Sequence, residues 1–526
     1  MPIHEIAHMG VFDLAIVVVT LLALVVLAGY LARRQQDTAD YYLGGRALPA
    51  WALGLSLAAN QVSAISLVGA PAFVALREGG GLAWLQYELA VPLSMAVLLV
   101  WGVPFLRRAR GADIYSVVED RLGKGTRRFL ASLFLLGRGL GAGVILYTSS
   151  LVVDACSGWG IPVSLAVVAG VAVAYTGLGG LVADVFSDVF QLGLLWGGTL
   201  VASAYLAWKL LSQGRFLAGV DPSRLVALDF GGHGLGDGAT FAFWPMLIGG
   251  FFLYLSYYGC DQTQAQRILA ARSDHAAQKA LTIAALIRFP LVLTYCFFGL
   301  LLGSLLVADP AFAQRLVGQP ADALVPQFIV GYLPAGLLGL AVAGILAAAL
   351  SSIDSALNSL SAVTLAEILP RQSQVPSRIH LLWARLGTLA WGILATGFAW
   401  WFSRGQETVI EMVNRVGSLV YGPILAVFVL AWGSRRATGN SAVLGGILGV
   451  GANLLVSFLA PGVSWLWWNV LGCLTTLIVG HFFSIGETAP LAPIQTAHTP
   501  ARRLARLLLA MFVAILLLLT ATLGLG

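Results

Sequence analysis

The sequence predicts an all-α integral membrane protein with about fourteen transmembrane helices. Two observations support this prediction, the composition and the length of the apolar runs. Of the 526 residues, 59% are hydrophobic and only 10% are charged, whereas a soluble globular chain carries roughly 25% charged residues. Each apolar run is long enough to cross a hydrocarbon core of about 30 Å as a helix that satisfies its own backbone hydrogen bonds. We therefore expect a multi-pass protein in the lipid bilayer of a cell membrane, either a plasma membrane or a bacterial inner membrane.

The apolar runs define the predicted spans one after another from the N-terminus. The first run, from Val11 to Ala32, lacks the basic region and the small-residue cleavage site of a secretory signal, so it counts as a spanning helix. The full set lies near 11–32, 50–76, 83–105, 129–154, 160–177, 182–209, 240–258, 279–307, 330–365, 379–402, 408–432, 441–460, 464–485 and 503–524.

Lys and Arg residues gather in alternate loops, a pattern that marks the cytoplasmic side of a membrane protein. The residues concerned are Arg33, Arg34, Arg107, Arg108, Arg110, Arg127, Arg128, Arg267, Arg272, Lys279, Arg371, Arg378, Arg385, Arg435, Arg436, Arg502, Arg503 and Arg506. This distribution places both termini outside. The longest outer loop, with Lys209, Arg215 and Arg224, is an exception, and the rule is weaker for longer segments.

Other residue patterns argue against nucleic-acid binding, a transition-metal site and an enzyme. The formal charge of +6 comes from short loops and not from a basic face or tail. His4, Glu5 and His8 match the HExxH pattern of zinc proteases, but they lie beside the first span without an evident third ligand. The cysteines are scattered without ligand spacing. They are Cys156, Cys260, Cys296 and Cys473.

Five ionisable residues lie well inside predicted spans. They are Glu88, Arg138, Asp188, Arg288 and Asp354. Each would cost a few kcal/mol or more if it faced lipid. We therefore expect them to face an interior cavity that holds a solute or an ion, or to form structural pairs such as Glu88 with Arg138 or Arg288.

Two polar segments interrupt otherwise apolar spans. Hydroxyl and carboxylate oxygens recur from Ser351 to Ser359, and oxygen donors suit a hard cation. Residues 60–63 and 69–71 introduce polar side chains, Gly and Pro into the span near 50–76. An interruption there would free backbone carbonyls inside the membrane, as at the binding sites of many transporters.

With these segments, the chain resembles the sodium:solute symporter family, which includes sodium-coupled sugar, proline, sialic acid and vitamin transporters. The resemblance covers at least residues 41 to 430. It rests on Tyr41 to Arg46, Ser63 and Ala64 with Gly69 to Pro71, Asp261 to Arg267 with Ala270 to Ser273, Ser351 to Ser359, and Asn414 to Ser418 with Tyr421 to Pro423.

The resemblance implies a LeuT-type core, in which two inverted five-helix repeats hold solute and sodium at their interface. The first repeat would occupy residues 50–209 and the second residues 240–432. An extra helix with an inner linker, 1–40, would precede them, and three further helices, 441–526, would follow.

The resemblance also implies two sets of binding residues. The main sodium site would use backbone carbonyls of the first core helix and carbonyl and hydroxyl oxygens of the eighth, namely Ala59, Val62, Ala348, Ser351 and Ser352. A second sodium site would use Asp188. The solute would contact Ser66, Glu88, Arg138, Tyr254, Tyr257, Arg288 and Asn414.

The function implied is symport of sodium with a small organic solute by alternating access. A sugar or polyol is favoured because Glu88, Tyr257 and Asn414 match the sugar-transporting branch. Ser66 and Tyr254 depart from that branch, and Arg138 or Arg288 could clamp a carboxylate, so a monocarboxylate, sialic acid, a vitamin or an amino acid is the alternative. A membrane sensor, an embedded enzyme and a channel fit less well, because the sequence offers no room for a signalling domain, no nucleophile–base set and no filter-like repeat.

Overall fold

The computed structural model describes residues 9–32, 38–62, 64–109, 113–368, 377–404, 409–484 and 499–524. Several residues used above therefore lie outside the described part, namely His4, Glu5, His8, Arg33, Arg34, Ser63, Arg110 and Arg371. Within that part the protein is nearly all helical. Its only β-type pairings are two isolated bridges, Leu48 with Ala271 and Leu235 with Val463.

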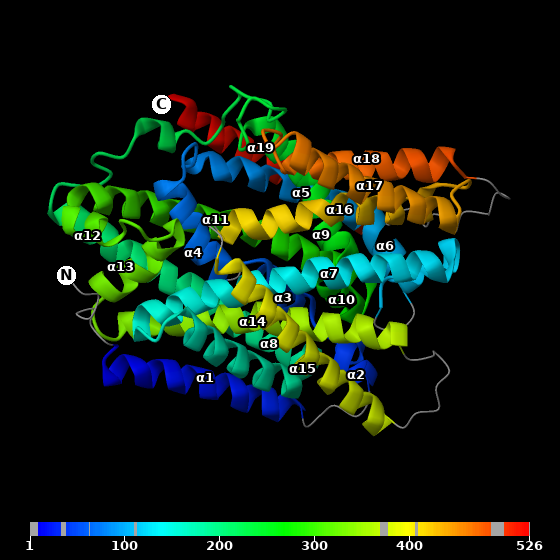
Figure 1. The fold of residues 1–526 in the computed structure, drawn as a ribbon, viewed down its shortest axis with the longest axis horizontal. Helices are drawn as coiled ribbons and strands as arrows, with labels where there is room; N and C mark the ends of the chain where they lie inside the picture. Colours follow the sequence, from blue (N-terminus) through cyan, green and yellow to red (C-terminus); the bar gives the residue numbers. More distant parts are fainter. Residues whose placement is uncertain are drawn as a thin grey trace.

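The long helices run roughly along one direction (Figure 1). In chain order the α-helices are α1 (Val11–Ala32), α2 (Thr38–Leu43), α3 (Ala50–Gln61), α4 (Ala64–Leu76), α5 (Ala90–Val97), α6 (Val103–Leu106), α7 (Ser116–Ser157), α8 (Ile161–Ser212), α9 (Gly250–Cys260), α10 (Gln262–Ala270), α11 (Asp274–Ala308), α12 (Pro310–Arg315), α13 (Leu324–Tyr332), α14 (Leu337–Ile368), α15 (Ser377–Phe402), α16 (Val409–Gly433), α17 (Gly439–Leu459), α18 (Leu466–Phe482) and α19 (Thr499–Thr520). Short 3-10 segments occupy Gly44–Arg46, Leu82–Leu89, Pro222–Leu225, Ala321–Ala323 and Ala521–Gly524, and π-helical segments occupy Leu98–Gly102 and Pro245–Gly249.

All fourteen predicted ranges overlap helical residues, so the all-α membrane class is confirmed. Among the described residues, nine helices are long and apolar enough to cross a membrane, and α3 with α4 would make a tenth. Ile161–Val173 and Leu466–Phe482 are shorter apolar helices. The count of fourteen spans and the outward position of both termini stay predictions.

The predicted interruption of the second span is present. Helix α3 ends at Gln61, Val62 has non-helical torsion angles (φ −98°, ψ 86°), and α4 continues in a direction that differs by 50°. The Gly69 to Pro71 segment does not break the chain, because it lies within α4. The interruption is therefore confined to the residues around Val62, in the middle of the span.

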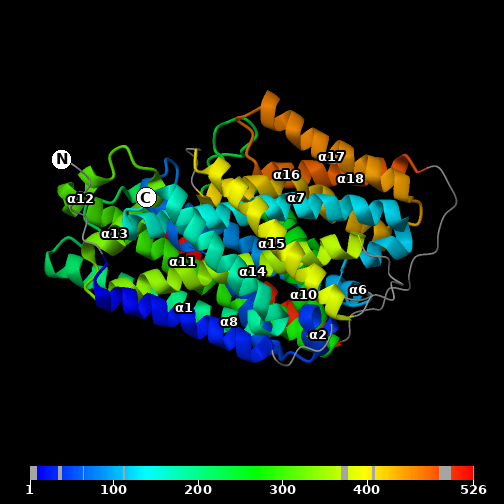
Figure 2. The ribbon, with the colours of Figure 1, turned by 60° about the horizontal axis from the view of Figure 1, so that its bottom comes forward.

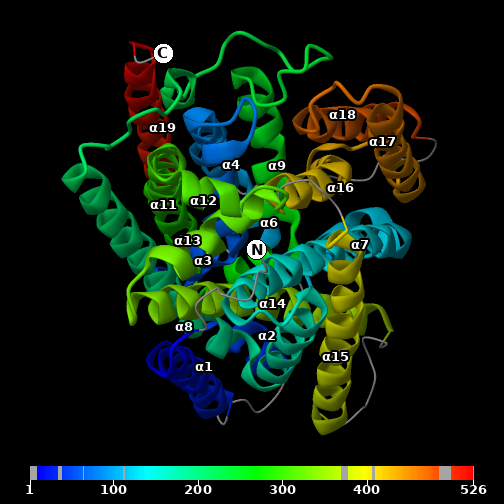
Figure 3. The same ribbon diagram turned by 60° about the vertical axis from the view of Figure 1, so that its left-hand side comes forward.

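Helix α14 lies at the centre of the bundle, and α1 and α19 lie at its surface. In its most apolar stretch, α14 has 78% of its residues buried inside the protein, against 18% for α1 and 17% for α19. Helix α1 packs on α8 and α14 at one edge, while α17 and α18 pack on each other and on α16 at the opposite edge (Figures 2 and 3). The broken pair α3 and α4 is enclosed between these groups.

Asp13 fastens α1 to the N-terminal end of α14. Its carboxylate accepts hydrogen bonds from the backbone N–H groups of Gly336 at 2.7 Å and Gly339 at 2.8 Å. These N–H groups have no partner within the helix, and a carboxylate there is also favoured by the helix dipole. The extra N-terminal helix is thus held by a specific polar contact as well as by apolar packing.

Candidate functional site

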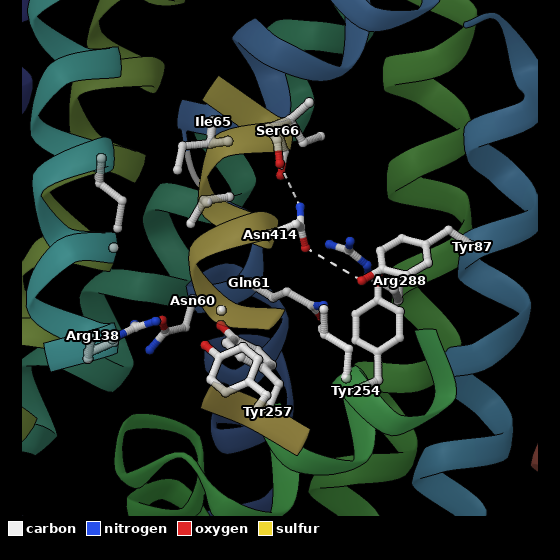
Figure 4. A pocket seen from close by; sticks show the side chains of 18 of the residues that line it. Asn60, Gln61, Ile65, Ser66, Tyr87, Arg138, Tyr254, Tyr257, Arg288 and Asn414 are labelled. Carbon is white, nitrogen blue, oxygen red and sulfur yellow. Dashed lines mark hydrogen bonds between the residues drawn. The ribbon is translucent and has the colours of Figure 1, made fainter. Parts of the chain in front are cut away.

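A central cavity of about 110 Å³ lies beside the break between α3 and α4. Its wall comes from α3, α4, the 3-10 segment Leu82–Leu89, α7, α9, α11 and α16 (Figure 4). The lining residues are Asn60, Gln61, Ile65, Ser66, Trp84, Tyr87, Gly137, Arg138, Gly141, Ile145, Leu253, Tyr254, Tyr257, Arg288, Ile410, Val413, Asn414, Gly417 and Tyr421.

Six of the seven residues predicted to contact the solute lie on this wall. They are Ser66, Arg138, Tyr254, Tyr257, Arg288 and Asn414. The seventh, Glu88, is 1% exposed and lies behind the wall. Helices far apart in the sequence thus bring the predicted set together around one cavity, and the role of each residue in binding stays a prediction.

Glu88 is fully engaged by neighbouring helices. Arg288 of α11 donates from Nε to Glu88 Oε2 at 2.8 Å and from Nη2 to Glu88 Oε1 at 3.0 Å. The hydroxyl of Tyr254 on α9 donates to Glu88 Oε1 at 3.3 Å. The structural pair that the sequence allowed between Glu88 and Arg288 is therefore present. The bidentate geometry is the strong arrangement for an arginine and a carboxylate.

Arg138 of α7 faces the cavity without such a partner. Its Nη2 atom donates to the side-chain oxygen of Asn60 at 3.1 Å, and its Nε atom has no hydrogen-bond partner among the described residues. Tyr257 and Asp261 lie within electrostatic reach, but Arg138 forms no ion pair in the described part of the chain. Figure 4 shows its guanidinium beside Asn60 and Tyr257.

Aromatic rings form another part of the wall. Tyr87 and Tyr254 have ring centroids 4.8 Å apart, and Tyr257 and Tyr421 have centroids 6.1 Å apart. The Tyr87 hydroxyl donates to Asn414 Oδ1 at 3.5 Å, which connects the 3-10 segment to α16. Such a wall combines apolar faces with hydroxyl and amide groups, as small-molecule sites commonly do.

The five residues of the expected main sodium site lie on two helices that pack together, α3 and α14. Ala59 and Val62 lie at the C-terminal end of α3, where the last carbonyls of a helix lack partners within it. Ser351 donates a hydrogen bond to Asp188, and the fully buried hydroxyl of Ser352 has no partner among the described residues. Joint binding of an ion stays a prediction.

Asp188, the expected residue of a second sodium site, already has three partners. It accepts hydrogen bonds from Ser56 and Ser351, and Arg267 Nη2 lies 2.8 Å from its Oδ2 atom. The same Nη2 atom lies 2.9 Å from Asp184 Oδ2. Arg267 therefore stands where a cation would be expected at Asp188.

The structure adds to what the sequence indicated for Arg267. The residue lies in the connection between two predicted spans, as expected, but it is 1% exposed and sits on the short helix α10. Besides the two aspartates, it donates to Ser56 at 2.6 Å and to Ser355 at 2.7 Å. A single guanidinium thus connects α10 with α3, α8 and α14. The side chain can be buried in this position because the two aspartates compensate its charge.

Sequence reasoning also missed other polar groups of the site. Asn60 and Gln61 were recognised only as an interruption of the helix, although a polar residue at such a break can face the cavity directly. Asp184 precedes Asp188 by four residues, which is one helical turn, and this spacing could have indicated it. No sequence pattern indicates Tyr87 as a residue of the site, because its position beside α16 depends on the tertiary packing.

Comparisons with known proteins agree with this arrangement. The family model described as "Sodium:solute symporter family" matches residues 41–449. The sodium/sialic acid symporter NanT of Aliivibrio fischeri is 26% identical over 479 residues, 89% of this chain and 91% of the relative. Human sodium-coupled monocarboxylate transporter 1 is 28% identical over 434 residues, 80% of this chain and 68% of the relative.

A further relative is the human sodium/iodide cotransporter, 27% identical over 462 residues, 85% of this chain and 68% of that protein. Among solved structures, the outward-open, substrate-bound state of a Na+-coupled sialic acid symporter superposes with a TM-score of 0.79. The match covers 92% of this chain and 100% of the other at 22% sequence identity. The two chains have the same fold.

Proposed function

The chain belongs to the sodium:solute symporter family, and we propose that it takes up a small organic anion together with sodium by alternating access. It is an integral membrane protein, and sodium is the co-transported ion. Its relatives are transporters and symporters, not enzymes. The solute class is the part of the proposal that rests on the geometry of the cavity.

The charge of the cavity wall is the observation that supports an anionic solute. Two cationic side chains reach it, and one of them, Arg288, is neutralised by Glu88. Arg138 donates to the amide of Asn60 at 3.1 Å, lies beside the hydroxyl of Tyr257, and forms no ion pair among the described residues, although Asp261 lies within electrostatic reach. A guanidinium that faces a cavity inside a membrane is costly unless a counter-charge joins it. A carboxylate of the solute would supply that charge in a bidentate pair.

The same geometry weakens the case for a neutral sugar. That prediction depended partly on Glu88, whose carboxylate oxygens accept from Arg288 and Tyr254 and do not reach the cavity wall. A solute that combines hydroxyl groups with a carboxylate remains compatible with Asn414, Ser66 and the tyrosines. Sialic acid, which the name of one relative mentions, is such a molecule, and a simple monocarboxylate is another.

Coupling would pass through the end of α3. Asn60, which accepts from Arg138, directly follows Ala59, whose carbonyl is a proposed sodium ligand. A solute that orders Arg138 and Asn60 would favour the backbone conformation that binds sodium, and sodium would favour solute binding to the same degree. The membrane potential adds roughly 2.3 kcal/mol per charge per 100 mV to sodium entry. The repeats 50–209 and 240–432 would then move relative to each other around this site.

A ligand screen on the purified protein tests the proposal across several classes of solute. Thermal unfolding is measured with carboxylates, neutral polyols and amino acids, each in sodium and in choline. We expect stabilisation by carboxylates only in sodium. The variant Arg138→Gln should lose this effect, and Arg138→Lys should weaken it because a lysine cannot form the planar pair. The exposed Arg404→Gln serves as the matched control.

Stabilisation of the unchanged protein by neutral polyols, retained in Arg138→Gln, would contradict the anion assignment. Equal stabilisation in sodium and in choline would contradict sodium coupling.

A further inference from the structure

A second, smaller cavity continues the central cavity toward the side that the sequence predicts to be cytoplasmic. We call it the inner cavity. Its volume of about 10 Å³ is close to what one water molecule needs. Both cavities are bounded by α7, α9 and α16, and they share Gly137, Arg138 and Tyr421. Arg138 therefore stands between the space expected to hold the solute and the side to which the solute would leave.

The order of residues along the helices gives the position of the inner cavity. Outside the shared set its wall consists of Leu133, Phe134, Ser256, Cys260, Asp261, Val420 and Ile424. On α7 these residues precede the ones that line the central cavity alone, and on α16 they follow them. In the predicted topology α7 runs outward and α16 runs inward. The inner cavity thus lies on the predicted cytoplasmic side of the central cavity.

Asp261 is the acidic residue of the inner cavity. It lies at the junction of α9 and α10, and it is 4% exposed. Its Oδ1 atom accepts a hydrogen bond from the backbone N–H of Thr263 at 2.8 Å, which caps α10. It lies within electrostatic reach of Arg138 but forms no ion pair with it in this conformation. Two buried groups of opposite charge therefore border one small cavity without direct contact.

Release of an anionic solute poses a physical problem at Arg138. The guanidinium would lose its counter-charge inside the membrane as the solute carboxylate departs, and this cost opposes departure. Another carboxylate on the exit side removes the cost, because it can pair with the same guanidinium once the solute has left. Asp261 is in the right place for this role, since it borders the inner cavity together with Arg138.

We propose that Asp261 is the release partner of Arg138, the residue that takes over the guanidinium when the solute carboxylate leaves toward the inner side. This inference rests on the proposed function and deepens it, because it names the group that lets the anion go. Asp261 acts through Arg138 and is a positioning residue. Since two carboxylates compete for one guanidinium, Asp261 lowers the affinity for the solute and speeds its release.

Thermal unfolding of the purified full-length protein in sodium, without solute, tests whether the two charges interact. Asp261→Asn removes the charge and keeps the cap of α10, because Asn and Asp cap helices about equally well. The melting temperature should fall by about 2–4 °C, since Arg138 then lacks its partner. In the Arg138→Gln background the same substitution should change it by less than about 1 °C. Asp261→Ser, which also keeps a capping side chain, is the second variant if Asp261→Asn does not give monodisperse protein.

Asp309→Asn is the matched control, because Asp309 also caps a helix. Its carboxylate accepts from the N–H groups of Ala311 and Phe312 at the start of α12. The change in melting temperature that it causes should be the same with and without Arg138→Gln.

Solute binding and release test the exchange itself, because a purely structural pair would also give coupling in the empty protein. The probes are N-acetylneuraminate and pyruvate, a hydroxylated carboxylate and a simple one. Asp261→Asn should bind the effective probe about tenfold more tightly in sodium, mainly through slower dissociation. Uptake into proteoliposomes at saturating probe should fall by a similar factor, so KM and kcat decrease together.

The outcomes separate this inference from the proposed function. Probe binding that requires Arg138 but is unchanged or weakened in Asp261→Asn would overturn the inference and leave the anionic solute in place. Equal changes of melting temperature by Asp261→Asn in both backgrounds would do the same. Probe binding that survives Arg138→Gln unchanged, or no binding of either probe, would remove the proposed anion and this inference together.

Discussion

The pair between Glu88 and Arg288 gives the sharpest prediction, because two expectations differ. The structure indicates that the pair stabilises the fold, whereas the resemblance to sugar transporters predicts that Glu88 binds the solute. Glu88→Gln should leave Arg288, which is 6% exposed, without its counter-charge. Removing one member of a buried pair costs about 3–5 kcal/mol. Arg288→Met should cost a similar amount because it leaves the Glu88 carboxylate buried and unpaired.

The double variant Glu88→Gln with Arg288→Met should recover most of this loss. Replacing both charged partners by groups of similar volume is often nearly neutral, so we expect the double variant within about 2 kcal/mol of the unchanged protein. The coupling energy from the cycle should then exceed about 3 kcal/mol, above the usual 0.5–3 kcal/mol for residues in contact. Equilibrium unfolding in detergent, followed by far-UV circular dichroism, measures all four proteins.

The pair between Arg77 and Glu411 is the internal control. Its Nε to Oε1 distance is 3.0 Å, but the Arg77 side chain is 40% exposed. Ion pairs with this exposure contribute roughly 0–1 kcal/mol, so the same cycle on Arg77 and Glu411 should show little coupling. Additive losses at Glu88 and Arg288, or a Glu88→Gln variant of unchanged stability that no longer binds solute, would refute the structural assignment.

Three further predictions concern the ion site, the pH dependence and the packing of the broken helix. Ser351→Ala with Ser352→Ala should abolish sodium-stimulated uptake into proteoliposomes, because two proposed hydroxyl ligands are lost, while the protein stays folded. Burial raises the pKa of Asp322 to about 7 from an ordinary value of 3.8. The folded state then binds its proton more tightly than the unfolded state, so this group lowers stability progressively from about pH 4 to pH 7, by a few kcal/mol at most. Asp322→Asn should therefore gain thermal stability relative to the unchanged protein as the pH rises from 4 to 8. Gly54→Ala should lower the free energy of unfolding by about 1–3 kcal/mol, because its Cβ would lie 2.7 Å from Ile283 Cβ and 2.8 Å from the Ala280 carbonyl oxygen on α11.

Each of these outcomes has a clear opposite. Retained sodium stimulation in the double serine variant would place the ion elsewhere. A stability difference between Asp322→Asn and the unchanged protein that does not vary with pH would show that this carboxyl does not titrate in that range. A Gly54→Ala variant as stable as the unchanged protein would show that α3 can move away from α11 without loss.

The composition and the local sequence patterns predicted those features of the fold that depend on the solvent around the chain and on individual helices. The membrane class followed from composition, because apolar runs of this length have no stable alternative to spanning helices. The break near Val62 followed from polar residues in an apolar span. The resemblance to a family then rested on residues from five separate segments of the chain. Six of the seven residues that it implied as solute contacts lie on the wall of one cavity.

The partners of the charged residues could not be predicted in the same way. The sequence allowed Glu88 to pair with Arg138 or with Arg288, which lies 200 residues away, because either arrangement would compensate the charge. Likewise the sequence places Arg267 in the connection between two spans, and only the packing of α3, α8 and α14 around it shows that its side chain is buried. Charge compensation acts through space over a few ångströms, and separation along the chain does not restrict it.

What the sequence alone determined is therefore the environment of the chain, the order of its helices and the kinds of oxygen and nitrogen atoms available inside the membrane. Only the tertiary structure decided which of those atoms are already satisfied by one another. Glu88 and Asp188 have charged partners within the protein, whereas Arg138 forms no ion pair among the described residues. The physical reason is that helix packing fixes the distances between groups, and these distances decide whether a charge in a low-dielectric interior is compensated by another residue.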